Sequence, residues 1–223
     1  MSIKVQTLLR EDLEIKTALI TVFDKTNIVA LAHVLEIYGV NIISTGGTLK
    51  ALQDVGIKAI PVTDVAPFPE MLDGRIKILQ PQIFGGLLAN KANPDHIQQI
   101  TGKGIAPIDM VVCNFYPFEQ VAAKEGVTGA ELLDNIDIGG PTSVKSAAKN
   151  LGSVCVVTSP ADYATIITAM KDNGGKIPYS IRLDLALKAF DTIAKYETAI
   201  KTTLSERLGK DPSTAVPAKL KSR

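Results

Sequence analysis

ALITVFDKTNIVALAHVLEIYGVNIIS, residues 18–44, reads as a strand, a helix and a second strand in succession. Residues 18–23 form a short apolar run with β-branched side chains, as expected for a buried strand. In residues 26–38 one face of the pattern is apolar, which predicts a helix, and Gly39 ends it. Residues 40–44 repeat the strand pattern. Two strands joined by a crossover helix indicate a parallel sheet that helices cover on both faces.

The same alternation continues along the chain. We expect further strands at residues 57–62, 110–113 and 154–157, and a helix that follows residues 44–48 and reaches about residue 55. Thr128 and Glu131 have the spacing of a capping box, Ser159 and Pro160 mark another helix start, and a long helix is expected over residues 181–204. The sequence thus predicts an α/β fold with three layers, α/β/α, around a mostly parallel five-stranded sheet.

The organisation and composition indicate a soluble globular protein that is long enough to bury a sizeable core. Residues 1–16 show no pattern and are expected to be an N-terminal extension, residues 17–208 a single domain, and residues 209–223 a disordered basic tail. The net charge of +1 argues against a nucleic-acid partner. Charged residues at the N-terminus argue against a signal peptide, and no apolar run is long enough to span a membrane. Cys113 and Cys155 lie in apolar runs, as expected for buried thiols of a cytoplasmic protein.

Two polar motifs follow predicted strands, at the edge where ligands bind in such folds. Thr21 and Lys25 lie at the end of the first strand. Residues 44–48, STGGT, form a strand-to-helix turn whose backbone N–H groups can approach a phosphate. The alternative is that STGGT is only a tight turn.

A second group of polar residues lies in longer connections. Residues 67–77 are rich in Pro and Gly and carry Arg75 and Lys77, which favours a binding loop over a plain solvated connection. Asn114 and Tyr116 follow the strand at residues 110–113. Tyr116 can equally be a packed aromatic side chain whose hydroxyl meets the backbone.

The segment NIDIGGP, residues 135–141, places Asp137 before a flexible glycine pair at the start of a predicted helix. Lys145 and Lys149 then lie four residues apart on one face of that helix. An acid, a helix N-terminus and two cations suggest a site for a phosphorylated small molecule. The alternative is an ordinary helix start with exposed lysines. No metal-binding motif is present, and His33 and His96 have no spaced partner, so we expect no metal and no cofactor.

Together these motifs resemble the IMP cyclohydrolase domain, the N-terminal half of a bifunctional purine-synthesis enzyme that also carries a formyltransferase. The resemblance runs from about residue 17 to residue 200. It is carried by DKT (24–26), STGGT (44–48), FPEMLDGR (68–75), NFYPF (114–118), IDIGG (136–140), AAKN (147–150) and LALKAF (185–190). It implies a methylglyoxal synthase-like fold, in a homodimer.

The implied activity closes the ring of 5-formamidoimidazole-4-carboxamide ribotide to IMP with loss of water, the last step of de novo purine synthesis. No metal or organic cofactor is implied. Carried over by position, the groups at the reacting centre are Lys77, Tyr116, Asp137 and Lys149. The substrate contacts are Thr21, Lys25, Thr45, Gly46, Gly47, Thr48, Arg75, Asn114, Ile138, Gly139 and Lys145.

The resemblance also suggests roles at the reacting centre. Asp137 would orient or deprotonate the carboxamide, and Lys149, beside it, would set its charge state. Lys77 and Tyr116 would donate to the formyl oxygen as negative charge develops.

The chain departs from the family pattern at five positions. Ile78 stands where the family has a hydroxyl, Gln80 and Phe84 replace two imidazoles, Phe23 replaces a serine, and Lys145 replaces an arginine. These departures keep an alternative open, a non-catalytic nucleotide-binding or regulatory module like the allosteric domain of carbamoyl phosphate synthetase. Methylglyoxal synthase itself would need an aspartate and histidine arrangement that we cannot place. As an enzyme, the chain would be a natural stand-alone protein fed by a separate formylating enzyme, or an excised domain.

Overall fold

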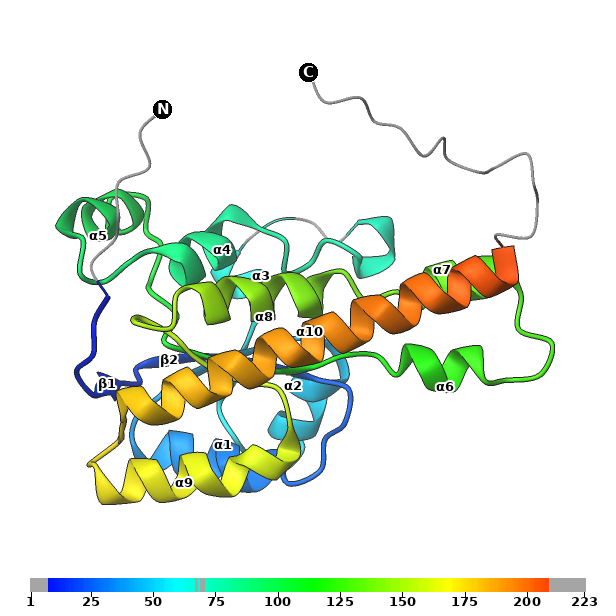
Figure 1. Ribbon diagram of the computed structural model, residues 1–223. Coiled ribbons are helices and arrows are strands. Elements are labelled where there is room, and N and C mark those ends of the chain that lie inside the picture. The colour runs from blue at the N-terminus through cyan, green and yellow to red at the C-terminus, as the bar shows by residue number, and fades with distance from the viewer. Residues whose placement is uncertain (1–7, 67, 69–70, 209–223) are drawn as a thin grey trace. The chain divides into compact units, whose positions relative to one another are not determined.

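The computed structural model describes residues 8–66, 68 and 71–208, which fall into two compact units (Figure 1). Unit 1 comprises Met1–Phe115 and Asp137–Ile193, and unit 2 comprises Tyr116–Ile136 and Ala194–Arg223. The disordered tail predicted at residues 209–223 lies outside the described residues.

Unit 1 contains a fully parallel sheet of five strands, in the order β4-β3-β2-β5-β6. The strands are β2 (Thr17–Val22), β3 (Asn41–Ser44), β4 (Ala59–Pro61), β5 (Met110–Asn114) and β6 (Cys155–Val157). All five predicted strands are therefore confirmed, with ends shifted by one or two residues. A separate antiparallel pair joins β1 (Leu13–Glu14) to β7 (Lys176–Ile177).

The helices of unit 1 connect these strands. They are α1 (Ile28–Ile37), α2 (Gly46–Gln53), α3 (Val62–Val65), α4 (Pro81–Leu88), α5 (Pro94–Thr101), α8 (Gly139–Lys149) and α9 (Tyr163–Asp172), with two 3-10 turns, η1 (Leu72–Gly74) and η2 (Pro160–Asp162). Gly39 ends α1 with a positive φ of 71°, as predicted, because glycine adopts this conformation without steric strain. The last helix, α10 (Tyr179–Leu208), continues from unit 1 into unit 2.

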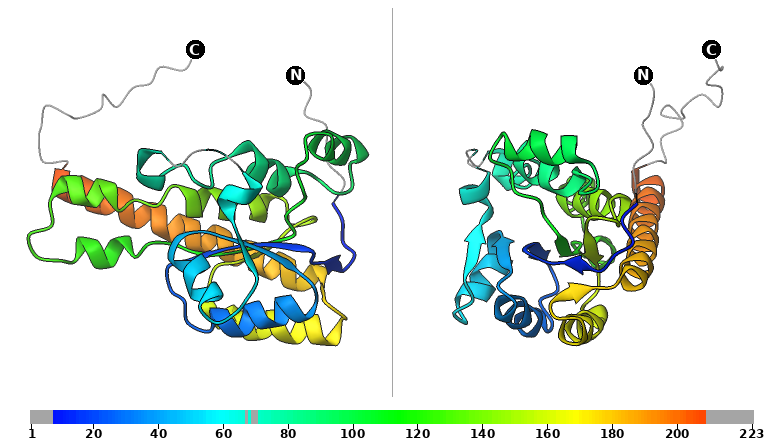
Figure 2. Two further views of the ribbon diagram at one scale, coloured as in Figure 1. Left: turned by 180° about the vertical axis from the view of Figure 1, so that it is seen from behind. Right: turned by 90° about the vertical axis from the view of Figure 1, so that its left-hand side faces the viewer.

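The core of unit 1 has two halves, one on each face of the sheet. Successive side chains of a strand point to opposite faces, so Ile20 packs with α1 and α9 while Leu19 packs with α4 and α8. Figures 1 and 2 show α1 and α9 on one side of the strands and α4 and α8 on the other. The predicted three-layer α/β/α fold is confirmed.

Unit 2 contains α6 (Phe118–Ala122), α7 (Gly129–Asp134) and the end of α10. Phe118 packs edge-on against Tyr196, with 6.5 Å between ring centroids, in a small apolar cluster. The Thr128 hydroxyl accepts from the Glu131 N–H and the Glu131 carboxylate accepts from the Thr128 N–H. The predicted capping box is confirmed.

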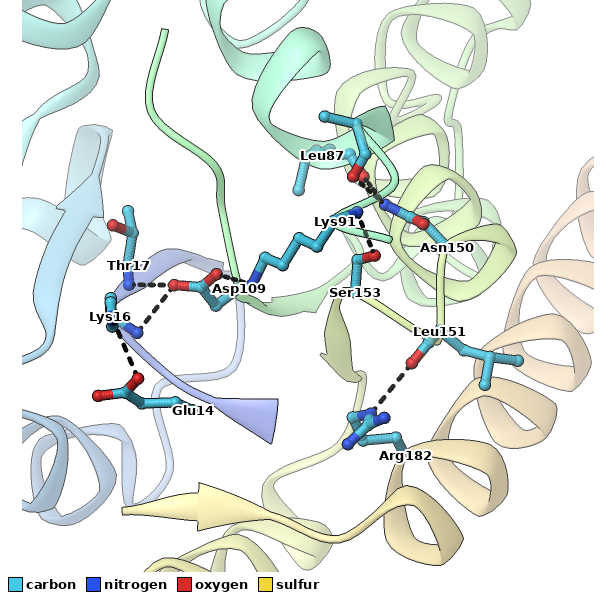
Figure 3. A network of polar contacts seen from close by, with 11 residues as sticks. Glu14, Lys16, Thr17, Leu87, Lys91, Asp109, Asn150, Leu151, Ser153 and Arg182 are labelled. Atoms are coloured by element: carbon cyan, nitrogen blue, oxygen red, sulfur yellow. Dashed lines mark hydrogen bonds and ion pairs between the residues drawn. The ribbon is translucent and has the colours of Figure 1, made fainter. Parts of the chain in front are cut away.

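A polar network fixes the edge of the sheet at which the strands begin (Figure 3). The buried Asp109 carboxylate accepts from the backbone N–H groups of Lys16 and Thr17, each at 2.8 Å, and pairs with the Lys91 ammonium. It thereby joins the starts of β2 and β5, which are neighbours in the sheet.

The described part of residues 1–16 takes part in this edge, whereas the sequence suggested an extension. Leu13 and Ile15 are buried, and Leu13 pairs with Ile177. The guanidinium of Arg182, fully buried, donates to the carbonyls of Glu11 (3.0 Å) and Ile177 (2.7 Å). A strand of two residues is too short to show a periodic pattern, so it could not be recognised in the sequence.

Candidate active site

The opposite edge of the sheet, where the strands end, contains the topological switch point. The chain leaves β2 toward β3 on one side and leaves β5 toward β6 on the other, although β2 and β5 are neighbours. Connections therefore diverge between these two strands, and ligands of parallel α/β sheets bind in the crevice that results. The segments that the sequence singled out in unit 1 meet here, with the exceptions given below.

Asn114, at the end of β5, fixes the loop that follows β2. Its Oδ1 accepts from the N–H groups of Phe23 (2.7 Å) and Asp24 (2.8 Å), and its Nδ2 donates to the Asp24 carbonyl (2.9 Å). Within the loop, hydrogen bonds from the Thr26 side chain and backbone lower the pKa of Asp24. The Asn114 amide thus holds the loop that carries Lys25; its role as a substrate contact stays a prediction.

Thr48, in the first turn of α2, fixes the same strand end from the other side. Its hydroxyl donates to the Val22 carbonyl (2.9 Å) and accepts from the Val22 N–H (3.0 Å). Both of these hydrogen bonds of the buried hydroxyl are made with the backbone of β2. The STGGT turn is therefore docked on the strand end, with its helix start facing the loop of Lys25.

Two ammonium groups meet the start of α2. Lys77 Nζ lies 3.5 Å from the position that a Cβ of Gly46 would occupy, and Lys25 Nζ lies 3.7 Å from the corresponding position at Gly47. Gly46 has a positive φ of 56°, which favours glycine there. Two cations beside the positive end of a helix favour a negative charge there, because the N–H groups and both charges act in the same direction.

The residue after Lys77 reaches the second helix start of the site. Ile78 is buried, and its Cδ1 and Cγ1 lie 2.9 and 3.0 Å from the position that a Cβ of Gly139 would occupy. A side chain on Gly139 would overlap Ile78. Lys77 and Ile78 thus connect the start of α2 to the start of α8.

Asp137 caps α8. Its Oδ1 accepts from the Gly140 N–H at 2.9 Å. A Cβ on Gly140 would lie 2.7 Å from Asp137 Oδ2 and 3.0 Å from Phe115 Cδ1. Neither Gly139 nor Gly140 has a positive φ, so the pair allows close approach of neighbours instead of supplying flexibility.

The sequence proposed the start of α8 as an anion cradle. In the structure the Gly140 N–H donates to the Asp137 carboxylate, whereas the two lysine ammonium groups lie at the start of α2.

Lys149 does not lie beside Asp137. It is the last residue of α8, and the rise of the helix places it about 15 Å from Gly139 along the axis. The next residue, Asn150, belongs to the opposite edge of the sheet, where its amide donates to the carbonyls of Leu87 and Ala89 (Figure 3). The expectation that Lys149 is adjacent to Asp137 is wrong within one chain. Lys145, in the middle of α8, is exposed.

The other predicted residues have the following places. Thr21 lies at the end of β2 and Thr45 precedes α2, both half-buried, and Ile138 is exposed before α8. Arg75 follows η1, and its Nη1 pairs with Asp73 Oδ2 at 2.7 Å. Tyr116 is exposed and belongs to unit 2, in which its carbonyl accepts from the Phe118 N–H. Pro67, Pro69 and Glu70 of the predicted binding loop lie outside the described residues.

The departures from the family pattern are mostly interior residues. Ile78 and Phe84 pack in the core half that contains α4 and α8, and Gln80 is buried. Phe23 is exposed. Sequence reasoning treated Ile78 as a lost hydroxyl and missed its contact with Gly139, because nothing in a single sequence pairs two residues that lie 61 positions apart.

Both cysteines are free and buried, as the sequence predicted. Burial raises the pKa of the Cys155 thiol to about 12. Burial and the nearby Asp137 carboxylate raise the pKa of the Cys113 thiol. Neither thiol is therefore a nucleophile at neutral pH. Among the described residues, no three His, Cys, Asp or Glu side chains group as metal ligands, and no helix is long and apolar enough to cross a membrane.

Comparison with known proteins gives a consistent result. Residues 27–142 match the MGS-like domain family, and residues 147–223 match the family described as AICARFT/IMPCHase bienzyme. The bifunctional purine biosynthesis protein PurH of Chlorobium phaeobacteroides is 50% identical over 86% of this chain and 37% of its own length. PurH of Chlorobium phaeovibrioides is 50% identical over 90% of this chain and 38% of its own length.

The chain thus spans well under half of the curated relatives that it matches. A crystal structure of ForH superposes with a TM-score of 0.75 at 31% sequence identity, over 85% of this chain and 98% of that chain. The fold, the matched families and these relatives agree, and the chain belongs to the MGS-like domain family.

Proposed function

We propose that the chain is an IMP cyclohydrolase, which closes the ring of 5-formamidoimidazole-4-carboxamide ribotide to IMP and releases water. One observation carries the proposal: two consecutive residues of one loop reach the helix start with the two ammonium groups and the helix start that holds the Asp137 carboxylate. Lys25 and Lys77 meet the start of α2, and Ile78 touches the helix start that Asp137 caps. The similarity to PurH proteins supports the same reaction.

The phosphate of the ribotide is assigned to the start of α2. The N–H groups after Thr45, the helix dipole and the Lys25 ammonium favour a dianion there, and Lys77 is assigned to the formyl oxygen. Gly46 and Gly47 leave the backbone open to it. Holding the phosphate at this point directs the imidazole ring of the substrate toward the start of α8.

The ring closure then needs proton transfer at two atoms. The carboxamide nitrogen attacks the formyl carbon and forms the new C–N bond, while the carbonyl electrons move to the formyl oxygen. Asp137 accepts the carboxamide proton, and Lys77 donates to the oxygen as its charge develops. The proton on Asp137 then passes to the hydroxyl, which leaves as water as the C–O bond breaks, and the formamido nitrogen gives its proton back to Lys77 as the C=N bond of the pyrimidine ring forms.

The substrate carries both reacting groups, so the protein contributes chiefly their orientation. A ribotide whose phosphate is held at the start of α2 and whose reacting groups face Asp137 and Lys77 would be oriented in this way. Tyr116 belongs to unit 2 and is given no role in this step. Lys149 is not assigned to proton transfer with Asp137, because the length of α8 separates them.

The remaining assignments are also proposals. The protein is proposed to act in the cytoplasm, whose reducing conditions suit its two buried free thiols. It is proposed to be a homodimer, for which the exposed Leu187 and Phe190 of α10 offer apolar surface. Its substrate must be supplied by a formyl transfer to the amino group of the precursor ribotide, which is a reaction of another class.

The test is to incubate the purified protein with the formylated ribotide and to follow IMP formation by absorbance. We expect a rate above the spontaneous rate, and the same rate for Lys171→Ala, an exposed lysine on α9. IMP binding without any such rate would leave only a nucleotide-binding module, and the enzyme proposal would be abandoned.

A further inference from the structure

The loop that carries Lys77 is held in place by one buried apolar side chain. In residues 71–79 the side chains are exposed or half-buried except that of Ile78, which is 6% exposed. Turn hydrogen bonds run through the segment, from the Lys77 N–H to the Gly74 carbonyl (3.2 Å) and from the Gln80 N–H to the Ile78 carbonyl (2.9 Å). A displacement of Ile78 is therefore passed on to Lys77.

The surface on which Ile78 rests is the start of α8. Gly139 has no Cβ, and the Ile78 methyl occupies the space that one would need. The following residue, Gly140, gives its N–H to Asp137. Two consecutive residues of α8 thus receive Ile78 and Asp137, and their Cα atoms are only about 3.8 Å apart.

We propose that Ile78 is a positioning residue, which fits against the bare backbone of Gly139 and so fixes Lys77 relative to the Asp137 carboxylate. The predicted effect of Ile78 on catalysis rests on the proposed ring closure. The positioning contact goes beyond that proposal because it gives a role to a residue that touches neither the phosphate site nor the reacting atoms.

The fit is mutual, so it is tested by a double-mutant cycle. Gly139→Ala introduces a methyl group 2.9 Å from Ile78 Cδ1 and 3.0 Å from Cγ1, so the Ile78 side chain must move, and on our proposal the loop moves with it. We expect kcat to fall on the order of tenfold, because sub-ångström misplacement of reacting groups is costly. KM should change by less than about threefold, since Lys25 and α2 still bind the phosphate. Ile78→Ala alone should lower kcat by a few fold, because the loop loses its contact.

The decisive variant combines the two changes. In Ile78→Ala/Gly139→Ala the added methyl takes the place of the removed side chain, and kcat should return to within about threefold of the wild type. Rescue of this kind is not expected from two independent defects. A double variant that is as slow as the product of the single variants would overturn the proposal.

A matched control separates positioning from packing. Gly85 of α4 stands in a similar contact with an isoleucine, with Ile105 Cδ1 3.3 Å from its Cβ position. Gly85→Ala should shift the melting temperature by a few degrees and leave kcat unchanged. If Gly85→Ala and Gly139→Ala lower kcat and melting temperature in the same proportion, Ile78 is only a packing residue.

The cycle also has a readout without turnover. Ribose 5-phosphate binding, measured by calorimetry, reports on Lys77 at the start of α2. Suppose the wild type is inactive but binds ribose 5-phosphate, and the effects of the Ile78 and Gly139 substitutions on that affinity are coupled. This result would refute the proposed function and support the positioning contact. Suppose instead that the enzyme is active, that all four proteins of the cycle bind ribose 5-phosphate equally, and that the two substitutions affect kcat independently. This result would refute the positioning role and leave the proposed function intact.

Discussion

Lys77 Nζ lies 3.5 Å from the position that a side chain of Gly46 would occupy. The distance means that the ammonium group stands directly over the first turn of α2, where the helix offers its N–H groups. A glycine is therefore required at position 46 for two reasons: the positive φ, and the open space between the helix and the lysine. The two needs can be separated by experiment.

Gly46→Ala is expected to weaken both the fold and the anion site. A non-glycine residue at this φ lowers the free energy of unfolding by about 1 kcal/mol. The methyl group also covers the N–H groups, so KM for the ribotide should rise about tenfold. Gly39→Ala is the matched control, because Gly39 has a φ of 71° and no heavy atom within 4 Å of its Cβ position. It should show the same loss of stability in denaturant titrations with an unchanged KM; a raised KM in this control would contradict the assignment of the site.

Lys25→Ala and Lys77→Ala should differ in kinetics although both remove an ammonium from the same helix start. Lys25 is assigned to the phosphate alone, so its loss should raise KM about tenfold with kcat retained. Lys77 is assigned to the formyl oxygen, so its loss should lower kcat at least about tenfold. Steady-state rates over a range of ribotide concentrations give both parameters, with Lys171→Ala as reference. A Lys77→Ala protein with wild-type kcat and a raised KM would show that Lys77 only binds phosphate.

Asp137→Asn tests the charge of the carboxylate with little change in the fold. An asparagine caps a helix as well as an aspartate, so the hydrogen bond from Gly140 is kept and the unfolding free energy should change by less than about 0.5 kcal/mol. Turnover should fall at least about tenfold because the proton acceptor is lost.

Ser159→Ala is the control for Asp137→Asn. The Ser159 hydroxyl accepts from the Ala161 N–H at another helix start. Its loss should lower stability by about 1 kcal/mol and leave turnover unchanged. The role given to Asp137 fails if Asp137→Asn turns over at the wild-type rate.

The fold could be predicted because its strands and helices are long enough to show a period. Residues 18–23 and 110–113 are continuous apolar runs, as strands buried on both faces require, and β2 and β5 lie there. The strand β1 could not be predicted, since its two residues pair with the distant β7, and Arg182 bonds Glu11 just before it. Such contacts are tertiary, and local sequence does not encode them.

The site could be predicted in part. That Lys25 and Lys77 approach one helix start could be expected from polar residues that follow strands in such a fold, but their roles and that of Asp137 stay predictions. The placement of Lys149 beside Asp137 was wrong: it was carried over from the family resemblance, and α8 runs its whole length between the two residues. Twelve residues separate it from Asp137, and the rise of an α-helix puts more than two turns between residues so spaced. The Ile78–Gly139 contact joins two segments whose closeness only the fold reveals.

Asp109→Asn is expected to destabilise the fold without changing the chemistry. Asp109 lies at the opposite edge of the sheet from the site, and its neutral analogue leaves the Lys91 ammonium without its buried partner. The unfolding free energy should fall by about 3 kcal/mol. Lys50→Ala breaks the exposed pair with Asp54 and should cost less than about 0.5 kcal/mol. Turnover per folded molecule should match the wild type in both; a small loss of stability in Asp109→Asn would show that the network of Figure 3 does not hold the edge.

The buried thiols should make stability fall at alkaline pH. The pKa of Cys155 is raised from 9.0 to about 12, and burial raises that of Cys113 also, so the folded state disfavours both thiolates. In the unfolded chain the thiols ionise near pH 9. The stabilising effect of protonated thiols is therefore complete below that pH and is lost as the pH rises toward the folded-state pKa. Denaturant titrations between pH 8 and pH 10 should show this decline. The decline should be shallower in Cys113→Ala/Cys155→Ala; the slopes are compared because the alanines themselves alter packing.

The same burial predicts that an aromatic disulfide reagent at pH 8 modifies neither cysteine in the native protein and both after unfolding. Rapid modification of the native protein would show that the core around β5 and β6 opens readily, and the predicted pH dependence would then not hold.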